Sequence, residues 1–487
     1  MPAVKAPSRS VKERVRRPSW PAAGSLPGIA ERASLGKTAR SVVPREDHAM
    51  LDLPEDRPDP LDLLEQQART RLAELVPVRY GRMLVSPFAY FRGAALPMAE
   101  DLAATPSTGL TVQACGDAHL SNFGVFGSAE RRLVFDINDF DETLPGPWEW
   151  DVKRLAASLE IAARENGFPA DRRRKILVNA IGRYRQAMLT FAGMNDLDVW
   201  YARADVDQLR VELKSALTGR LRKALDKGIA RARTRDSMQA VGKLTRVVDG
   251  RRRIIADPPL IMPISDLLPE QEESAGLEDM LPDLLAEYCR TLREDSATLL
   301  SRFQYADLAR KVVGVGSVGT RCWVLLMVGV DDSPLFLQVK EAEQSVLSRF
   351  TEPSTYHNEG QRVVVGQRFT QASSDLFLGW FRMDVGLDGK RHDYYVRQLR
   401  DWKLSVDIAG MSPGWMRRYG GLCGWTLARA HARTGDRVAI AAYLGGATVF
   451  EEAIADFAAS YADLNERDYQ NLKNAASSGR ITVQRGL

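Results

Sequence analysis

Residues 115–123 read Cys-Gly-Asp-Ala-His-Leu-Ser-Asn-Phe, and residues 135–142 read Phe-Asp-Ile-Asn-Asp-Phe-Asp-Glu. The first segment places an Asn five positions after an Asp, and the second is a strand-like run that ends in carboxylates. Transfer of a phosphoryl group from a magnesium nucleotide needs such groups. Asp117 can accept the proton of an attacking hydroxyl. The candidate metal ligands are Asn122, Asp139 and, as the second choice of carboxylate, Asp136.

The two segments resemble the catalytic loop and the metal-binding segment of kinase-like phosphotransferases, above all the aminoglycoside and choline phosphotransferase group. That group has a Gly-Asp-Leu-His-Pro-Gly-Asn loop followed by an Ile-Asp-Trp segment. The departure is Cys115, where the group usually has His, and it removes no metal ligand. The resemblance implies these roles: Asp117 as the catalytic Asp, His119 as the loop His, Asn122 and Asp139 as metal ligands, and Asp151 as the Asp that opens the next helix.

Four carboxylates lie within the seven residues 136–142. Carboxylates this close ionise together only at a cost unless a cation is present, so the cluster favours a metal site. The structural alternative is that Asp and Asn here only cap turns and helices. His119 and His431 are interpreted as structural residues that orient loops by hydrogen bonds.

Composition and charge indicate a globular protein and argue against a nucleic-acid-binding one. The chain has 487 residues, 45% of them hydrophobic and 27% charged, as is ordinary for a globular protein. Residues 1–50 carry ten Lys or Arg and four Asp or Glu, a charge of +6. The whole chain has a net charge of +4, so the remaining residues carry 4 − 6 = −2. The basic character therefore belongs to the N-terminal segment, and we expect no nucleic-acid partner.

Four dispersed cysteines indicate a reducing compartment and no zinc site. The sequence has no apolar run long enough to span a membrane and no apolar core of a secretory signal. We therefore expect a cytoplasmic protein without a membrane partner.

Residues 311–340 contain a second group of interest, the glycines of a Gly-x-Gly-x-x-Gly motif. A dinucleotide-binding fingerprint must be followed by a helix, but the residues that follow here are strand-like, with a turn and a further strand. That order resembles the phosphate-covering hairpin of the kinase-like group. By this resemblance Lys340 pairs with the nucleotide phosphates; the alternative is a surface lysine that closes a strand. The candidate nucleotide-binding residues are Gly314, Gly316, Ser317, Gly319 and Lys340.

The pattern downstream predicts a helix over 358–373, a strand over 393–400 that leads to a hinge, and a helix over 420–433. A kinase-like helix would supply an acidic partner for Lys340, and three residues compete for that role: Glu359, Glu341 and Glu343. Val-Asp-Gly-Arg between apolar pairs predicts a hairpin over 246–255.

In the kinase-like group the glycine loop precedes the catalytic loop, whereas here it follows. A circular permutation explains this order, because a site is defined by residues that converge in space. The competing explanation is that the glycine loop belongs to an unrelated β-domain.

The chain also resembles, from about residue 60 to 475, a bacterial family named only as domain of unknown function 2252. The segments that carry this likeness are 86–93, 116–124, 311–320, 396–401 and 428–433. The family name implies no reaction.

We therefore expect an α+β, two-lobed, protein-kinase-like fold, circularly permuted, with a largely helical C-lobe and a small antiparallel β N-lobe. The expected divisions are a flexible basic tail over 1–58, a catalytic and metal segment with a helical region over 59–304, a glycine-loop β-lobe over 305–405, and a helical completion of the C-lobe over 406–487. Arg82 and Arg92 either contact an anionic ligand or pair with carboxylates at the edge of the core.

The expected function is transfer of a phosphoryl group from ATP with Mg²⁺ to a hydroxyl on a small molecule or protein that the sequence does not identify. Three alternatives stay open: a nucleotide-binding pseudokinase or regulatory module, an AMP-transferase on the same fold, and a metal-dependent phosphohydrolase built on Asp117, His119, Asp136 and Asp139.

Overall fold

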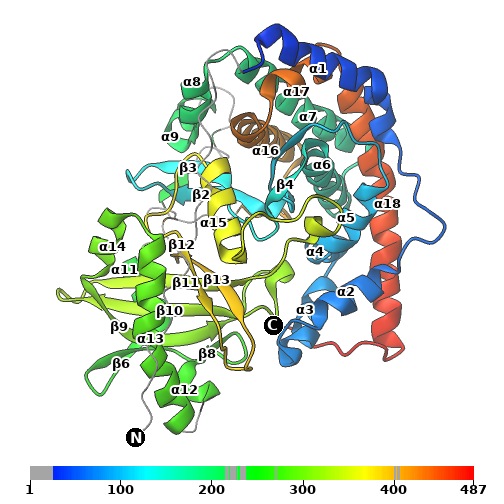
Figure 1. The fold of residues 1–487 in the computed structure, drawn as a ribbon. Helices are drawn as coiled ribbons and strands as arrows, with labels where there is room; N and C mark the ends of the chain where they lie inside the picture. The colour runs from blue at the N-terminus through cyan, green and yellow to red at the C-terminus, as the bar shows by residue number, and fades with distance from the viewer. Residues whose placement is uncertain are drawn as a thin grey trace, which may run out of the picture.

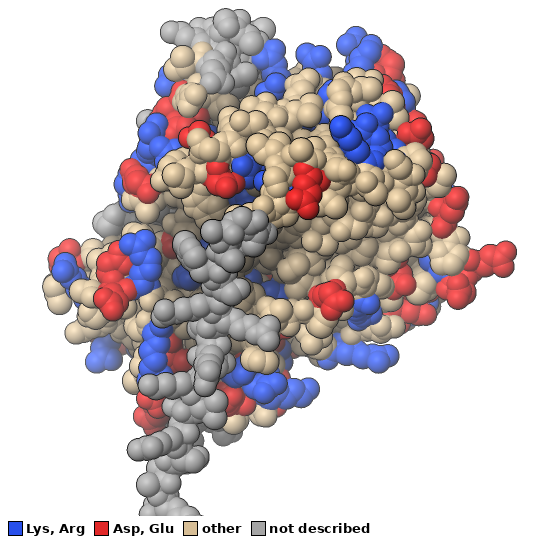
Figure 2. All heavy atoms as spheres, turned by 45° about the horizontal axis from the view of Figure 1, so that its top comes forward, with Lys and Arg blue, Asp and Glu red and all other residues tan. Residues whose placement is uncertain are grey.

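Most helices gather in one body, and the largest β-sheet lies beside it (Figure 1). The computed structural model describes residues 26–213, 237–268, 271–399 and 406–486, together with residues 219, 226, 227, 229, 230 and 402. Both helices and antiparallel sheets are present, so the predicted α+β class is confirmed. Figure 2 shows Lys, Arg, Asp and Glu side chains interspersed over the face that it presents.

The helical body is built around α6 (Trp148–Glu165), which is buried along almost its whole length. The Trp148 ring stacks on Tyr184 with centroids 5.7 Å apart. Aromatic side chains of this size dominate the energetics of a core. The other helices of the body are α2 (Pro60–Ala68), α3 (Val76–Met83), α4 (Pro87–Gly93), α5 (Ala95–Ala103), α7 (Ala170–Ala192), α8 (Asp196–Tyr201), α9 (Val206–Leu213), α16 (Pro413–Thr434), α17 (Arg437–Leu444) and α18 (Val449–Ser477), with 3₁₀ turns η2 (Ala73–Leu75) and η3 (Leu120–Asn122).

No single helix among those described is long and apolar enough to cross a membrane. Only α17 and α18 taken together reach that length and composition, and they meet at a bend of 87°.

Two short sheets lie within the helical body. The first pairs β1 (Thr111–Ala114) with β4 (Leu144–Pro147). The second joins β2 (Phe123–Gly127), β3 (Leu133–Ile137) and β5 (Ala204–Asp205). Phe123 opposes Ile137 in the β2–β3 hairpin, so the segments 115–123 and 135–142 are neighbours.

The largest sheet has six antiparallel strands in the order β12-β13-β11-β10-β9-β8. Every residue of its inner strand β11 is buried, because helices and neighbouring strands cover it. The strands are β8 (Ile261–Pro263), β9 (Phe303–Lys311), β10 (Cys322–Gly329), β11 (Pro334–Ala342), β12 (Gly379–Met383) and β13 (His392–Gln398).

Helices and turns accompany this sheet: α11 (Ser237–Leu244), α12 (Ile264–Leu267), α13 (Gln271–Thr291), α14 (Glu294–Leu300), α15 (Glu359–Thr370), η4 (Val315–Ser317) and η5 (Val346–Arg349). The predicted helix over 358–373 corresponds to α15. The predicted hairpin over 246–255 is confirmed as β6 (Thr245–Val248) and β7 (Arg251–Ile254). Its turn residues Asp249 and Gly250 both have positive φ, as a tight hairpin turn requires.

The flexible tail predicted over 1–58 is wrong for its second half, and residues 1–25 lie outside the described residues. Helix α1 (Ile29–Val42) packs on α17, and η1 (Arg45–Ala49) packs on α18. The buried His48 Nε2 lies 2.8 Å from the Tyr443 hydroxyl. Contacts with residues at the other end of the chain order this segment, and local periodicity cannot reveal such contacts.

The division predicted at residue 304 also differs from the packing. Strand β8 pairs with β9, and α13 packs against β12, so residues from about 261 onward accompany the large sheet rather than the helical body. The reason is that β8 completes an edge of the sheet, and short edge strands carry weak sequence signals.

Candidate functional site

The loop at 115–119 leaves β1 and is held by a buried carboxylate. Asp151 of α6 accepts hydrogen bonds from the backbone amides of Cys115 (2.6 Å) and Gly116 (2.9 Å). His431 Nε2 of α16 lies 3.2 Å from the same carboxylate. His431 therefore contacts the carboxylate that holds the loop, and Asp151 lies in the first turn of the helix that follows the acidic segment.

Gly116 has φ of +80°, a conformation that strains other residues. A Cβ built there would lie 2.4 Å from the Glu142 carbonyl oxygen, so the loop touches the acidic segment directly. This close approach fixes the position of the next residue, Asp117.

Asp117 is tied to the helical body by an arginine. Both Nε and Nη2 of Arg154 contact its oxygen Oδ1, at 2.9 and 2.7 Å. Burial would raise the pKa of Asp117, but neighbouring His119 and the Arg154 ion pair outweigh it and hold the pKa below its usual value. Its other oxygen, Oδ2, lies 3.6 Å from His119 Nε2 and borders a cavity. Burial lowers the pKa of His119 to about 3, so this imidazole is neutral.

Asn122 and Asp139 lie at adjacent ends of β2 and β3. The Asn138 amide donates to the Asn122 carbonyl oxygen (2.8 Å), and Asn122 Nδ2 donates to the Asp117 carbonyl oxygen (2.7 Å). The Nδ2 atom of Asn122 is therefore engaged by the loop, and Oδ1 is the side-chain atom that a metal ion would use. Burial and the neighbouring charge of Asp141 raise the pKa of Asp139.

Asp136, the second choice of carboxylate, does not line the cavity. It is 1% exposed, and it accepts hydrogen bonds from Arg429 (2.5 Å) and from the Ala372 amide (2.9 Å). It lies within β3, three residues before Asp139, where alternation along the strand points it away. The cluster predicted for a phosphohydrolase is thus not assembled. Within the described residues, no three His, Cys, Asp or Glu side chains gather closely enough to form a metal site.

The glycine turn lies across the same cavity. Residues Gly314, Gly316 and Ser317 line it, and a Cβ at Gly314 would meet nothing within 4 Å. Gly319 has φ of +92°, and its carbonyl oxygen accepts a hydrogen bond from the Leu72 amide (2.8 Å). The turn is therefore held from outside the sheet, while the face of Gly314 stays open to the cavity.

Lys340 of β11 forms its ion pair with Asp141, and its Nζ lies 3.9 Å from Asp139 Oδ2. Asp141 also accepts hydrogen bonds from the Tyr395 hydroxyl (2.8 Å) and from Ser317 Oγ (3.2 Å). Burial would lower the pKa of Lys340, but Asp139 and Asp141 raise it above its usual value. The lysine is thus a buried cation held beside the candidate metal ligand.

None of the three acidic partners proposed for Lys340 fills that role. Glu341 pairs with Arg321 (3.2 Å), and Glu359 of α15 pairs with Arg362 (2.5 Å). Arg362 also donates hydrogen bonds to the carbonyl oxygens of Asp141 (2.9 Å) and Thr143 (2.7 Å). Helix α15 therefore positions the acidic turn through a buried arginine.

One cavity of about 450 Å³ receives these residues from both parts of the molecule. The segments 115–122, 139–142 and 313–320 meet there with Lys340, although Gly319 and Asp136 do not line it. Oxygen ligands suit Mg²⁺. Asn122 and Asp139 supply two of them, and a cation there would offset the burial and the charge of Asp141 that raise the pKa of Asp139. These residues fit a magnesium ion whose remaining ligands would come from phosphate and water.

Sequence reasoning missed several residues of this cavity. Arg397 of β13 donates to Gln338 Oε1 (3.0 Å) and to the Asn138 carbonyl oxygen (2.9 Å), so it links the sheet to the metal segment. Its place next to the predicted hinge was the available signal. Arg71 and Arg79 also line the cavity, and no motif marks them.

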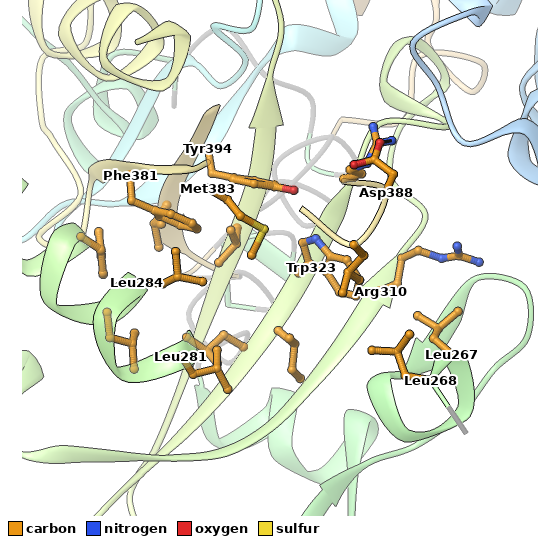
Figure 3. Close-up of a pocket in the computed structure, with 18 of the residues that line it drawn as sticks. Leu267, Leu268, Leu281, Leu284, Arg310, Trp323, Phe381, Met383, Asp388 and Tyr394 are labelled. Atoms are coloured by element: carbon orange, nitrogen blue, oxygen red, sulfur yellow. Dashed lines mark hydrogen bonds and ion pairs between the residues drawn. The ribbon is translucent and has the colours of Figure 1, made fainter. Parts of the chain in front are cut away.

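A second cavity, of about 360 Å³, lies on the opposite face of the large sheet. Figure 3 shows Leu281 and Leu284 of α13 facing Phe381 and Tyr394, with Arg310 at the edge. Val339 lines this apolar cavity and its neighbour Lys340 lines the other, because successive strand residues point to opposite faces.

No curated protein and no solved structure matches this chain. One family model, described as "Uncharacterized protein conserved in bacteria (DUF2252)", matches residues 71–475, which include every residue of the cavity described above except Gln67. The chain belongs to this DUF2252 family of bacterial proteins.

Proposed function

We propose that this protein is an ATP- and magnesium-dependent phosphotransferase with a two-lobed, protein-kinase-like fold in circularly permuted order. One observation carries the proposal: Lys340 of the large sheet and Asp139 of the helical body lie 3.9 Å apart at their charged atoms and border one cavity with the glycine turn. Lysine, glycine turn and metal-binding carboxylate are the shared parts of phosphoryl-transfer sites.

The order of elements supports the permuted fold. Strand β9, the glycine turn, β10, β11 with Lys340, α15, β12, β13 and α16 follow one another in the order expected of the kinase-like group. The loop at Asp117 and the segment at Asp139, which would come last, precede them in this chain. The unrelated β-domain is the weaker explanation, because Asp141 contacts both Lys340 and Ser317.

The mechanism assigns one task to each group. The open face of Gly314 lets phosphates approach the backbone, and Lys340 offsets their charge. Asn122 and Asp139 would hold magnesium, which supplies neutralisation of the charge on the phosphates. The acceptor hydroxyl oxygen forms a bond to the γ-phosphorus, the bond from that phosphorus to the β–γ bridging oxygen breaks, and the hydroxyl proton passes to Asp117 Oδ2.

Arg154 shapes the role of Asp117. Because the Arg154 guanidinium group contacts Oδ1 of Asp117, only Oδ2 of Asp117 can meet an acceptor. A carboxylate paired in this way is a weak base, so Asp117 contributes chiefly by orienting the hydroxyl and takes the proton late in the transfer.

The same ion pair favours a second candidate, a nucleotide-binding module without turnover. In such a protein Asp117 would stay paired with Arg154 and would not take the proton of an acceptor. ATP binding does not need that proton transfer.

Binding and product assays test the proposal. We expect ATP with Mg²⁺ to raise the thermal unfolding midpoint of the protein. Lys340→Met and Asp139→Asn should each abolish this shift, whereas Lys175→Met, at an exposed lysine of α7, should leave it unchanged. ADP formation that depends on an added hydroxyl compound distinguishes the enzyme from the binding module. Absence of nucleotide binding by the wild-type protein would refute both.

A further inference from the structure

Three arginines of the segment 71–92 line the cavity that holds Asp117: Arg71, Arg79 and Arg92. The Nε atom of each is buried without a hydrogen-bond partner. In the part of the chain that the structure describes, no carboxylate lies within 4.0 Å of any of the three guanidinium groups. Arg79 is buried, and Arg71 and Arg92 are half-buried. A cation with little access to water and no ion pair is costly, so these side chains favour an anion beside them.

The three side chains differ in how much protein structure they support. Arg79 donates to Gln67 Oε1 (3.0 Å) and to the Gly93 carbonyl oxygen (3.0 Å), and Arg71 donates to the Val318 carbonyl oxygen (2.5 Å). These two arginines hold backbone as well as facing the cavity. Among the residues that the structure describes, the Arg92 side chain has neither a hydrogen-bond partner nor an ion-pair partner, so its charge has no structural task there.

The directions in which the pKa values of these arginines shift agree with their lack of ion-pair partners. Burial lowers the pKa of Arg92, and the charges of Asp117 and Asp139 only partly offset that effect. Burial likewise lowers the pKa of Arg79, and the like charge of Arg71 adds to it. An anion beside Arg92 would offset the effect of its burial, and one beside Arg79 would also offset the repulsion from Arg71. Burial also lowers the pKa of Arg71, and the charge of Glu343, the largest of four acidic influences, only partly offsets it.

The position of Arg92 separates it from the nucleotide side of the cavity. Lys340, Asn122, Asp139 and the glycine turn already serve the phosphates in the proposed mechanism. Arg92 lies beneath the turn, where a Cβ at Gly316 would be 3.2 Å from its carbonyl oxygen, and its main favourable charge is Asp117. Asp117 is the group that meets the acceptor.

We infer that Arg92, supported by Arg71 and Arg79, forms a subsite for an anionic group of the acceptor, so that the acceptor is a hydroxyl compound that already carries a phosphate or a carboxylate. The inference rests on the proposed function, because it assigns the acceptor side of that site. The sequence left two roles open for Arg92: contact with an anionic ligand, or pairing with a carboxylate at the edge of the core. The inference assigns the first. Arg82, by contrast, donates to the Val313 carbonyl oxygen (2.6 Å) and holds the start of the glycine turn.

The test uses inorganic phosphate as the probe, titrated calorimetrically into the full-length protein with and without a saturating non-hydrolysable ATP analogue and Mg²⁺. We expect saturable phosphate binding in both conditions. Arg92→Gln should weaken it at least tenfold and Arg92→Lys by less. Arg69→Gln, at an exposed arginine just before this segment, should leave it unchanged. Circular dichroism and the thermal midpoint establish that each variant is folded.

The outcomes separate the inference from the proposed function. Phosphate binding that the nucleotide analogue abolishes would assign the arginines to the nucleotide and overturn the inference, while the phosphotransferase proposal stands. Phosphate binding that is absent from the wild type, or unaffected by Arg92→Gln, would also overturn it. Failure of the analogue to bind would instead remove the proposed function. As a second arm, ribose 5-phosphate should support faster ADP formation than ribose, and the reverse order would count against an anionic acceptor.

Discussion

Lys340 and Asp141 stand 199 positions apart in the chain, yet they form an ion pair that joins the large sheet to the acidic turn of the helical body. Lys340 is 3% exposed in its side chain, so removing the carboxylate leaves a buried cation with only the more distant Asp139 beside it. The pair therefore joins the two walls of the cavity.

Asp141→Asn should destabilise the protein by about 3 kcal/mol, because breaking a buried pair costs more than replacing it. Lys340→Met with Asp141→Asn should recover most of that loss. Urea unfolding of both single variants and the double variant measures the coupling free energy. Strictly additive effects would show that the two charges do not stabilise each other.

Asp117→Ala should reduce phosphoryl transfer about 10²–10⁴-fold and leave nucleotide affinity within a factor of two or so, since the side chain faces the acceptor. Initial rates of ADP formation and calorimetric titration with ATP and Mg²⁺ provide the two readouts. Asp384→Ala, at an exposed position, serves as the control. Equal turnover of the Asp117→Ala variant and the wild type would end the assignment of this residue.

Gly116→Ala should destabilise the protein by at least about 2 kcal/mol and impair activity, because a Cβ meets the Glu142 carbonyl oxygen and φ is +80°. Gly314→Ala is the matched control for folding, since φ there is −47° and nothing lies within 4 Å. Denaturation midpoints compare the two. Gly314→Ala should retain stability but weaken ATP binding, because its methyl group projects into the cavity.

His48 makes stability depend on pH. Burial and the charge of Lys153 lower its pKa to about 3, against 6.5 when unfolded. Between these values only the unfolded state takes up the proton, so stability falls as pH decreases from 6.5 towards 3 and is fully present above 6.5. The slope is about 1.4 kcal/mol per pH unit for one proton.

His48→Gln should therefore show a shallower loss of stability between pH 6 and pH 4.5 than the wild type. Buried His119 adds a similar dependence in both proteins, so the comparison isolates one proton. Identical slopes in wild type and His48→Gln would mean that His48 is not buried as a neutral group.

Filling the apolar cavity should stabilise the sheet. Val339→Ile directs one added carbon into that space and should raise stability by about 0.5–1 kcal/mol. Val324→Ile is the matched control on β10: its site is 2% exposed, packed in a different cluster, and does not line the cavity, so overpacking should cost about 1 kcal/mol. Chemical denaturation would contradict the expectation if both substitutions changed stability in the same direction.

Features set by neighbouring residues were predictable from sequence. The hairpin turn at Asp249 and Gly250, the glycine turn between strands and the helix over 359–370 each follow from short patterns. The convergence of Lys340 with Asp139 was predicted only through resemblance, because no local pattern specifies which distant segments meet.

Features set by tertiary contacts were not predictable. The partner of Lys340 is Asp141 rather than a residue of α15, and Asp136 pairs with Arg429 in the core. Helix α1 is ordered by residues at the far end of the chain, such as Asp436, whose carboxylate lies 2.9 Å from Arg32. Charged side chains near a sequence motif do not reveal which of several partners the fold will bring to them.

The apolar cavity behind β11 also leaves the strand that carries Lys340 less closely packed on one face than the body around α6. Protein interiors are otherwise packed to the density of organic crystals, so a side chain beside such a space has room to move. The space of about 360 Å³ lies between the sheet and α13, and Val339, the neighbour of Lys340, lines it. Small shifts of β11 should therefore cost less free energy than shifts of α6, which is buried along almost its whole length.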